Sequence, residues 1–386
     1  MTNSLLISNI TIVNPDQDSF VGDIYIENGQ ILKVGTSLTD IAEQHIDGAG
    51  KDWLMFPGYI DMHIHGSAGY DTMDATEDTL RGMARSLVKE GVTGFLATTM
   101  TQAIPAIDEA LLNVAQFDSC DGEAELLGVH IEGPFVSTKR AGAQPVEYIT
   151  LPSLEQFNHW QELSGQRIKQ ITMAPEVEGG YDFVRALSEQ GVIVSIGHSD
   201  ATSEEVGEAV QLGLKQATHL YNQMRPFHHR EVGVVGSTLL EDKLKVEIIV
   251  DFVHSHPQAV QIAYRLKGAS GIILISDAMR AKGLPFGDYE LGGQAVKVTE
   301  DGAQLSNGAL AGSVLSMEQA VKNMQAVTNC SWQELVAMSS TNAASQMNLL
   351  TKGYIRSGVD ADIVLLNQNL DVQITICRGK VVYEKS

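Results

Sequence analysis

The stretch Phe56-Pro-Gly-Tyr-Ile-Asp-Met-His-Ile-His-Gly66 joins a short apolar strand, from Tyr59 to Ile64, to two histidines one residue apart. Side chains at positions i and i+2 of a strand point to the same face, so His63 and His65 can converge on one point. Two imidazoles held in this way form half of a metal site. An isolated pair is equally well explained as two polar residues that close a strand. The remaining ligands must therefore be sought elsewhere in the chain.

After this strand, apolar strand-like runs alternate with helical patterns such as 79–91, which has apolar residues at helical spacing and stops at Gly91. Eight repeats of a buried strand and a helix predict an α/β fold of the (β/α)8 TIM-like barrel type. A doubly wound sheet is the alternative, but no Gly-x-Gly-x-x-Gly motif follows a strand. Two further helical patterns would close the barrel. The strand-like runs are 57–63, 91–99, 124–132, 168–176, 191–199, 216–220, 244–251 and 271–277, and the closing helices are 316–326 and 331–338.

Both ends of the chain differ from this middle part, because they are rich in β-branched residues and hairpin signals. Near the N-terminus, 5–13 and 23–34 are strand-like, and Asn28-Gly29 is a hairpin signal. Near the C-terminus, 361–366 and 372–383 look similar, with a turn at Arg378-Gly379. We therefore predict a small β-sandwich domain built from residues 1–54 and 350–386, and a catalytic barrel at 55–349.

The composition restricts the environment and the partners. The formal net charge of −22 argues against nucleic acid, which needs a basic surface. The N-terminus has no basic segment typical of a signal peptide, and no apolar run approaches the ~18 residues of a spanning helix, so we expect no membrane partner. Three scattered cysteines indicate no disulfide framework and fit a reducing cytoplasm.

Histidines gather at the predicted strand ends, where a barrel of this kind carries its chemistry. His198 and His219 end neighbouring strands and can bind one ion together, with Glu132 reaching across from the third strand. Three such ligands with an open position are the catalytic arrangement of zinc or a similar ion. Asp277 ends the eighth strand and is suited to act as a general base rather than as a helix cap. Six of the 11 histidines lie at or just past these ends: His63, His65, His130, His198, His219 and His254.

Two other features near the strand ends have weaker interpretations. His130 lies two residues before Glu132 on the same strand face, and we favour a supporting or packing role for it. His228, His229 and Arg230 form a cationic loop. Such loops are usually only solvated, but near a metal site this one could hold an anion.

The motifs resemble those of the N-acetylglucosamine-6-phosphate deacetylases, a family of the amidohydrolase superfamily. The resemblance runs through the whole chain, and it is the order and spacing of the motifs that make it specific. It implies hydrolysis of the acetamido group of N-acetyl-D-glucosamine 6-phosphate to D-glucosamine 6-phosphate and acetate, in amino-sugar catabolism and cell-wall recycling. The motifs are Pro57-Gly-Tyr-Ile-Asp-Met-His-Ile-His-Gly66, His130-Ile-Glu-Gly-Pro-Phe135, Gly197-His-Ser-Asp-Ala201, Thr218-His-Leu-Tyr-Asn-Gln-Met224, Asp251-Phe-Val-His-Ser-His-Pro257, Ser276-Asp-Ala-Met279 and Leu310-Ala-Gly-Ser313.

The resemblance also implies roles for individual residues. Glu132, His198 and His219 match the main metal ligands, and Asp277 matches the catalytic acid/base. Arg230 matches a position that can serve the neighbouring subunit of a homodimer. The positions that match substrate contacts are Asn222, Gln223 and Arg230 for the sugar phosphate, His254, and the backbone at Ala311 and Gly312.

Three positions depart from the family pattern. Gln144 stands where some members have a histidine near the carbonyl, and glutamine donates a hydrogen bond but carries no charge. Gln223 replaces a frequent alanine and Phe252 a frequent glycine. A backbone contact to phosphate does not depend on the side chain, so we interpret the replacements at Gln223 and Phe252 as small adjustments of substrate preference.

The number and identity of the ions stay open. Zinc is the favoured ion, and iron, manganese and cobalt accept the same ligands. With Glu132 as a bridge and Asp277 nearby, His63 and His65 can complete a second, weaker site. We therefore predict a capacity for one or two divalent ions per subunit.

Three alternatives to this activity are open. One is deacetylation of the epimer N-acetylgalactosamine 6-phosphate, which no residue excludes. Another is a different amidohydrolase, such as a ring-opening hydantoinase or dihydroorotase, although these usually bridge two metals with a carboxylated lysine and Glu132 stands there instead. A catalytically silent scaffold predicts broken ligands, and none is broken.

Overall fold

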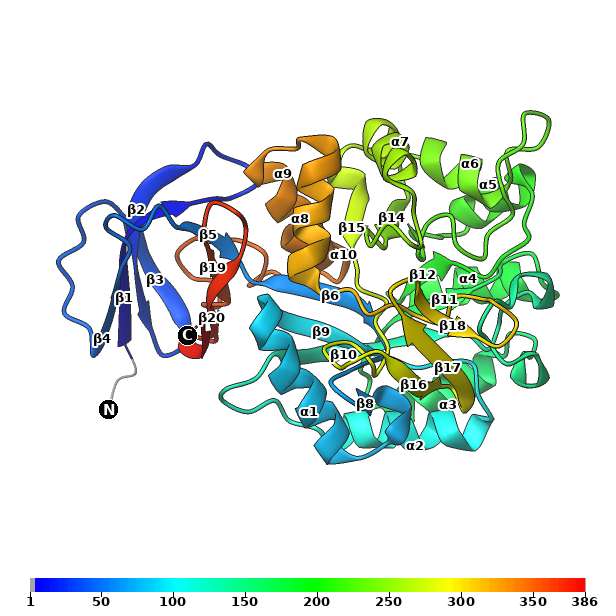
Figure 1. Ribbon diagram of the computed structural model, residues 1–386. Coiled ribbons are helices and arrows are strands. Elements are labelled where there is room, and N and C mark those ends of the chain that lie inside the picture. The colour runs from blue at the N-terminus through cyan, green and yellow to red at the C-terminus, as the bar shows by residue number, and fades with distance from the viewer. Residues whose placement is uncertain (1–3, 386) are drawn as a thin grey trace.

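Eight parallel strands form the centre of the larger domain in the computed structural model, which describes residues 4–385 (Figure 1). Their hydrogen-bonded order follows the chain, which confirms the barrel and excludes a doubly wound sheet. The last strand returns to the first through a parallel bridge between Ile64 and Ala278. The strands are β6 (Tyr59–Ile64), β9 (Val92–Thr98), β10 (Glu125–Glu132), β11 (Ile168–Met173), β12 (Ile193–Ile196), β13 (Gln216–Ala217), β14 (Lys245–Ile248) and β15 (Ile272–Leu274).

Helices surround these strands, and local signals explain where they begin and end. The helix predicted at 79–91 begins at Glu77, after the capping residue Thr76, and the chain reverses at Gly91 with a φ of +84°. The two closing helices begin after Ser316 and Ser331, as predicted. The helices are α1 (Glu77–Leu87), α2 (Ile104–Gln116), α3 (Leu154–Leu163), α4 (Gly180–Glu189), α5 (Ser203–Gln211), α6 (Gly233–Leu240), α7 (Pro257–Lys267), α8 (Met317–Thr328), α9 (Trp332–Val336) and α10 (Asn342–Gln346).

Strands from both ends of the chain form one mixed sheet at the side of the barrel (Figure 1). The sheet divides at β1, whose first half pairs with β4 and whose second half pairs with β5, and it encloses an apolar core of its own. This confirms that both chain ends contribute to one β unit, whereas the bounds 1–54 and 350–386 stay a prediction; Met1–Asn3 and Ser386 lie outside the described residues. The strands are β1 (Ser4–Ile12), β2 (Phe20–Glu27), β3 (Gln30–Gly35), β4 (Gln44–Asp47), β5 (Leu54–Pro57), β19 (Ile363–Leu366), β20 (Val372–Cys377) and β21 (Lys380–Glu384).

An antiparallel three-stranded sheet follows β15, and the sequence analysis made no prediction for this segment. It has a small apolar core that includes Met100, Met279 and Leu291. A short hairpin also follows β6. The strands are β16 (Gly287–Leu291), β17 (Gln294–Thr299) and β18 (Gly302–Leu305), and the hairpin consists of β7 (Gly66–Ser67) and β8 (Tyr70–Asp71).

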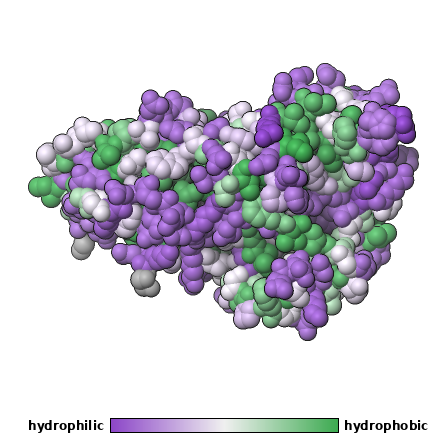
Figure 2. All heavy atoms as spheres, turned by 45° about the horizontal axis from the view of Figure 1, so that its top comes forward, coloured by the Kyte–Doolittle hydropathy of each residue, from purple (hydrophilic) through white to green (hydrophobic). Residues whose placement is uncertain are grey.

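Hydrophilic residues cover most of the face drawn in Figure 2, and apolar residues form separate patches on it. This distribution is ordinary for a chain of strongly negative net charge. No helix within residues 4–385 is both long enough and apolar enough to cross a bilayer.

Candidate metal-dependent active site

A cavity of about 300 Å³ lies at the carboxyl ends of the barrel strands. Both predicted carboxylates and four of the predicted histidines border it, although they are far apart in the sequence. The chain order of parallel strands explains this, because every strand delivers its last residues to the same rim. The predicted residues that line the cavity are His65, Glu132, Gln144, His198, His219, Asn222, Gln223, His254, Asp277 and Gly312.

Glu132, His198 and His219 converge within this cavity. Glu132 Oε1 lies 3.3 Å from His198 Nε2 and 3.0 Å from His219 Nε2, and the two Nε2 atoms are 3.1 Å apart. All three side chains are buried. Three N and O atoms at this spacing fit around one divalent ion, so the donor set is compatible with the predicted metal site.

The backbone at the ligands is unusual. His198, His219 and Asp277 have φ values of 47°, 33° and 47°, in the left-handed region that residues other than glycine rarely adopt. Such strain is found where the surrounding structure imposes it, commonly at active sites. His198 Nδ1 lies 2.9 Å from the carbonyl oxygen of Arg140 and must donate to it, which turns Nε2 toward Glu132 and His219.

His63, His65 and Asp277 form a second group beside the first. Asp277 Oδ1 lies 3.3 Å from His63 Nε2 and 3.4 Å from His65 Nε2. Glu132 lies between the groups, since its Oε1 is 3.5 Å from His63 Nε2 and its Oε2 is 3.3 Å from His65 Nε2. A carboxylate in this position can bridge two ions, as the sequence suggested.

The two carboxylates favour positive charge at this point. Burial on its own lowers the pKa of His63, but Asp277 and Glu132 outweigh burial and raise it to about 9. The pKa of His65 is raised in the same way. Burial opposes ionisation of Glu132, yet the surrounding histidines hold its pKa well below the usual range. The site is therefore electrostatically suited to a cation.

Gln144 and His254 have well-defined partners. The side-chain amide of Gln144 donates to Glu132 Oε2 at 2.7 Å, and its oxygen accepts from the Thr101 backbone N–H at 2.9 Å. Gln144 therefore orients the central carboxylate. His254 Nδ1 lies 2.7 Å from Asp251 Oδ2; burial alone lowers the pKa of this histidine, but the hydrogen bond to Asp251 raises it.

Two predicted substrate contacts do not line the cavity. Arg230 is exposed, and its guanidinium lies 3.0 Å from His229 Nε2. Ala311 is fully buried and donates its backbone N–H to Ala303, whereas its neighbours Leu310 and Gly312 border the cavity.

Comparison with known proteins agrees with this geometry. The sequence model of the Amidohydrolase family matches residues 54–382. An N-acetylglucosamine-6-phosphate deacetylase of Lysinibacillus sphaericus is 55% identical over 98% of this chain and 97% of its own. The chain belongs to the N-acetylglucosamine-6-phosphate deacetylase family of amidohydrolases. The resemblance inferred from the motifs is confirmed.

Solved structures of this amidohydrolase family have the same fold. The N-acetylglucosamine-6-phosphate deacetylase of Thermotoga maritima is 36% identical, with a TM-score of 0.89 over 98% of this chain and 100% of its own. A mutant of the Mycobacterium smegmatis enzyme, solved in complex with N-acetyl-D-glucosamine-6-phosphate, is 25% identical, with a TM-score of 0.91 over 99% of both chains.

Sequence reasoning missed several residues of this amidohydrolase site. Met100, Leu291 and Leu310 line the cavity but come from loops and from the unpredicted three-stranded sheet, where no spacing rule applies. Glu247 lies beneath the cavity and contacts His63. A signal for it existed, because Glu247 is a charged residue between the apolar Val246 and Ile248 in a strand predicted to be buried.

Proposed function

We propose that this protein hydrolyses the acetamido group of N-acetyl-D-glucosamine 6-phosphate to D-glucosamine 6-phosphate and acetate, as part of amino-sugar metabolism. The observation that carries the proposal is the convergence of Glu132, His198 and His219 beside Asp277 in one buried cavity. The names of the related proteins, at up to 55% identity over nearly the whole chain, support this substrate.

Asp277 is the proposed acid/base. Its carboxylate faces the cavity beside the ligand group, and His63 and His65 help to keep it ionised, so it can accept a proton at neutral pH. It takes a proton from the attacking water as the water oxygen adds to the amide carbon. When the C–N bond breaks, Asp277 returns that proton to the leaving amine.

A divalent ion held by Glu132, His198 and His219 would polarise the amide carbonyl and make the attacking water a stronger nucleophile. Gln144 keeps the central carboxylate in place through its 2.7 Å hydrogen bond. We propose zinc for the first position, with iron, manganese or cobalt as alternatives, and a weaker second ion at His63, His65 and Asp277.

The phosphate is proposed to contact Asn222, Gln223 and His254 at the cavity rim, with Arg230 supplied by the neighbouring subunit of a homodimer. The exposed position of Arg230, outside the cavity of its own chain, supports a contribution to a partner. We expect Arg230→Ala to raise KM with little change in kcat, because it removes a charge that binds the phosphate equally before and during reaction. An unchanged KM in a steady-state acetate assay contradicts this role.

The epimer N-acetylgalactosamine 6-phosphate is the alternative substrate within the same chemistry. A ring-opening amidohydrolase is less well supported, because Glu132 occupies the position at which such enzymes usually have a carboxylated lysine. A cytoplasmic location is proposed from the anionic substrate and from the three cysteines, which are free thiols.

The deciding experiment is metal analysis of the purified protein, followed by acetate release from the two epimeric sugar phosphates and from unphosphorylated N-acetylglucosamine. We expect bound divalent metal, loss of activity on chelation and fastest turnover of N-acetyl-D-glucosamine 6-phosphate. Equal turnover of the unphosphorylated sugar contradicts the phosphate site, and faster turnover of the galactosamine epimer assigns the alternative substrate.

A further inference from the structure

A layer of polar side chains fills the barrel beneath the metal ligands. Barrel interiors are usually filled by branched apolar residues, and a glutamate is almost never fully buried without a partner. Here Glu247 of β14 has no exposed surface, and it lies beside the buried side chains of Gln170 and Gln216. This layer therefore needs an explanation beyond packing.

The two carboxylate oxygens of Glu247 have different partners. Oε1 accepts from Gln170 Nε2 at 2.6 Å and from Gln216 Nε2 at 2.7 Å. Gln216 also donates to Gln170 Oε1 at 2.9 Å, which ties the two amides together. Oε2 lies 3.1 Å from His63 Nδ1, and within residues 4–385 His63 is the only ion-pair partner of Glu247.

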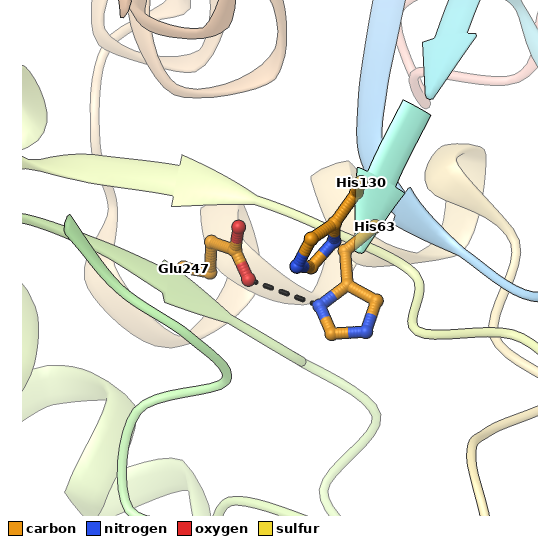
Figure 3. Close-up of side chains that lie close together, drawn as sticks. All are labelled: His63, His130 and Glu247. Carbon is orange, nitrogen blue, oxygen red and sulfur yellow. Dashed lines mark hydrogen bonds and ion pairs between the residues drawn. The ribbon is translucent and has the colours of Figure 1, made fainter. Parts of the chain in front are cut away.

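These contacts determine the protonation of His63. A carboxylate only accepts hydrogen bonds, so His63 Nδ1 must carry the proton that joins it to Glu247. Figure 3 shows the His63 ring with Nδ1 turned toward Glu247 and Nε2 facing away from it. Asp277 Oδ1 lies 3.3 Å from that Nε2, which is the nitrogen left to face an ion. His130 packs edge-on against His63, with ring centroids 4.5 Å apart, and so restricts rotation of the ring.

We propose that Glu247 is a positioning residue: it holds His63 as the Nδ1–H tautomer, so that Nε2 can bind a second divalent ion together with His65 and Asp277. Carboxylates that hold a ligating histidine in this way are common at metal sites. The inference rests on the metal-binding roles proposed above.

A metal ion between His63, His130 and Glu247 is the competing explanation for the same three side chains. Apart from His130 Nδ1 and His63 Nε2, the nitrogen and carboxylate oxygen atoms of these side chains already have hydrogen-bond partners within the protein. Glu247 Oε1 accepts from two amides, and His130 Nε2 lies 2.7 Å from Thr172 Oγ1. A positioning role explains every one of these contacts without an additional ion.

The test is Glu247→Gln, which keeps the shape of the side chain but replaces one hydrogen-bond-accepting oxygen by a hydrogen-bond-donating NH₂ group. Because Gln170 and Gln216 both donate to the Oε1 position, the new amide must place its oxygen there and turn its NH₂ toward His63 Nδ1. The proton of His63 then moves to Nε2, which can no longer bind an ion. We expect the Kd of the weaker ion to rise about 10- to 100-fold, while that of the tighter ion stays the same.

Ser195→Ala is the matched control, because Ser195 belongs to the same buried layer but contacts Thr218 rather than His63 or Glu247. It should leave both ions bound. Titration of the metal-free proteins with Mn²⁺ or Zn²⁺, read as ions per chain and as Kd, compares the variants. An unchanged Kd for the weaker ion in Glu247→Gln, or equal weakening at both sites, overturns the inference.

A second measurement does not depend on folding of the variant. Ring ¹⁵N chemical shifts of His63 in the zinc-loaded wild-type protein, assigned by the signal missing in His63→Ala, should report a proton on Nδ1 and none on Nε2; a proton on Nε2 of the loaded protein overturns the inference. If the wild-type protein is active but binds only one ion per chain in excess metal, the inference is overturned while the proposed function stands. Protein that binds no ion overturns the proposed function as well.

Discussion

At the scale of single residues, the most specific proposal is that Asp277 is the catalytic acid/base. We expect Asp277→Asn to keep the ion bound by Glu132, His198 and His219 but to lower kcat by about 10²- to 10⁴-fold, because asparagine cannot take up the proton of the attacking water. Metal analysis and acetate release on the same sample measure both effects. Activity within about tenfold of wild type contradicts the acid/base role.

If His254 contacts the substrate as proposed, its pairing with Asp251 makes substrate binding depend on pH. A histidine whose pKa is raised stays cationic to higher pH and loses its charge only above the raised value. We therefore expect KM for the anionic substrate to rise with pH as His254 deprotonates. Asp251→Asn removes the hydrogen bond that raises this pKa, so the midpoint of the KM profile should move to lower pH. An unmoved midpoint excludes His254 as the titrating contact.

The sequence predicted that the proposed ligands would meet, but it did not predict their surroundings. Glu132, His198, His219 and Asp277 could be found because each lies at or just past the end of a strand, and strand ends meet at one rim. Which oxygen of Glu132 faces which histidine depends on side-chain rotamers that no periodicity encodes. Gln144 illustrates this limit: its residue type was known, but its bond to Glu132 follows only from the folded loop.

At the scale of elements, the three-stranded sheet β16–β18 contributes to the wall of the cavity. Its β16–β17 turn contains Gly292 and Gly293, with φ values of 58° and 76°. A methyl group on Gly292 would lie 2.5 Å from Met100 Sδ, whereas one on Gly293 would meet only Gln102 Nε2, at 3.8 Å. Alanine at either position would therefore strain the backbone, but only alanine at Gly292 would press on Met100 in the cavity wall.

We expect Gly292→Ala to raise KM, because Met100 is pushed from its place beside the substrate cavity. Gly293→Ala is the control: it should cost about 1–2 kcal/mol of unfolding free energy through strain and leave KM unchanged. Steady-state kinetics and denaturant unfolding of both variants check this. Equal KM values in the two variants would mean that Met100 does not shape the site.

Periodicity could have located this sheet. The residues of β17 alternate between exposed and buried side chains, with Val296 and Val298 inside, and two glycines precede them. By contrast, β13 has only two residues, because the chain turns into the left-handed conformation at His219. Its extent could not be predicted from an apolar run that continues to Leu220.

At the scale of the whole molecule, Lys352 connects the barrel to the terminal sheet. Its ammonium lies 2.5 Å from Asp362 Oδ2 and 2.7 Å from Glu125 Oε2, and the side chain is 7% exposed. Asp362 immediately precedes β19, and Glu125 begins β10. Burial disfavours the ammonium, but the carboxylates outweigh burial and raise the pKa of Lys352.

We expect Lys352→Met to lower the free energy of unfolding by about 3–5 kcal/mol, because it leaves the buried carboxylate of Asp362 without its counter-charge. Lys380→Met is the control, since Lys380 and its partner Asp121 are both solvent-exposed, and it should cost about 0–1 kcal/mol. Denaturant unfolding measures both losses, provided that the unfolding free energy depends on denaturant concentration with the same slope in both variants. Equal losses in the two variants would contradict a special role for the buried cluster.

The division of the terminal sheet between both chain ends affects how the protein is made. Strand β5 pairs with β1 on one edge and with β19 on the other, where Leu54 lies opposite Leu366. On the ribosome the whole barrel is therefore synthesised before β5 can meet its second partner. Until then, one edge of a fully buried apolar strand stays open, and such an edge favours pairing with other chains. Completion of the small sheet is thus a late step of biosynthesis, because β19 follows the last barrel helix in the chain.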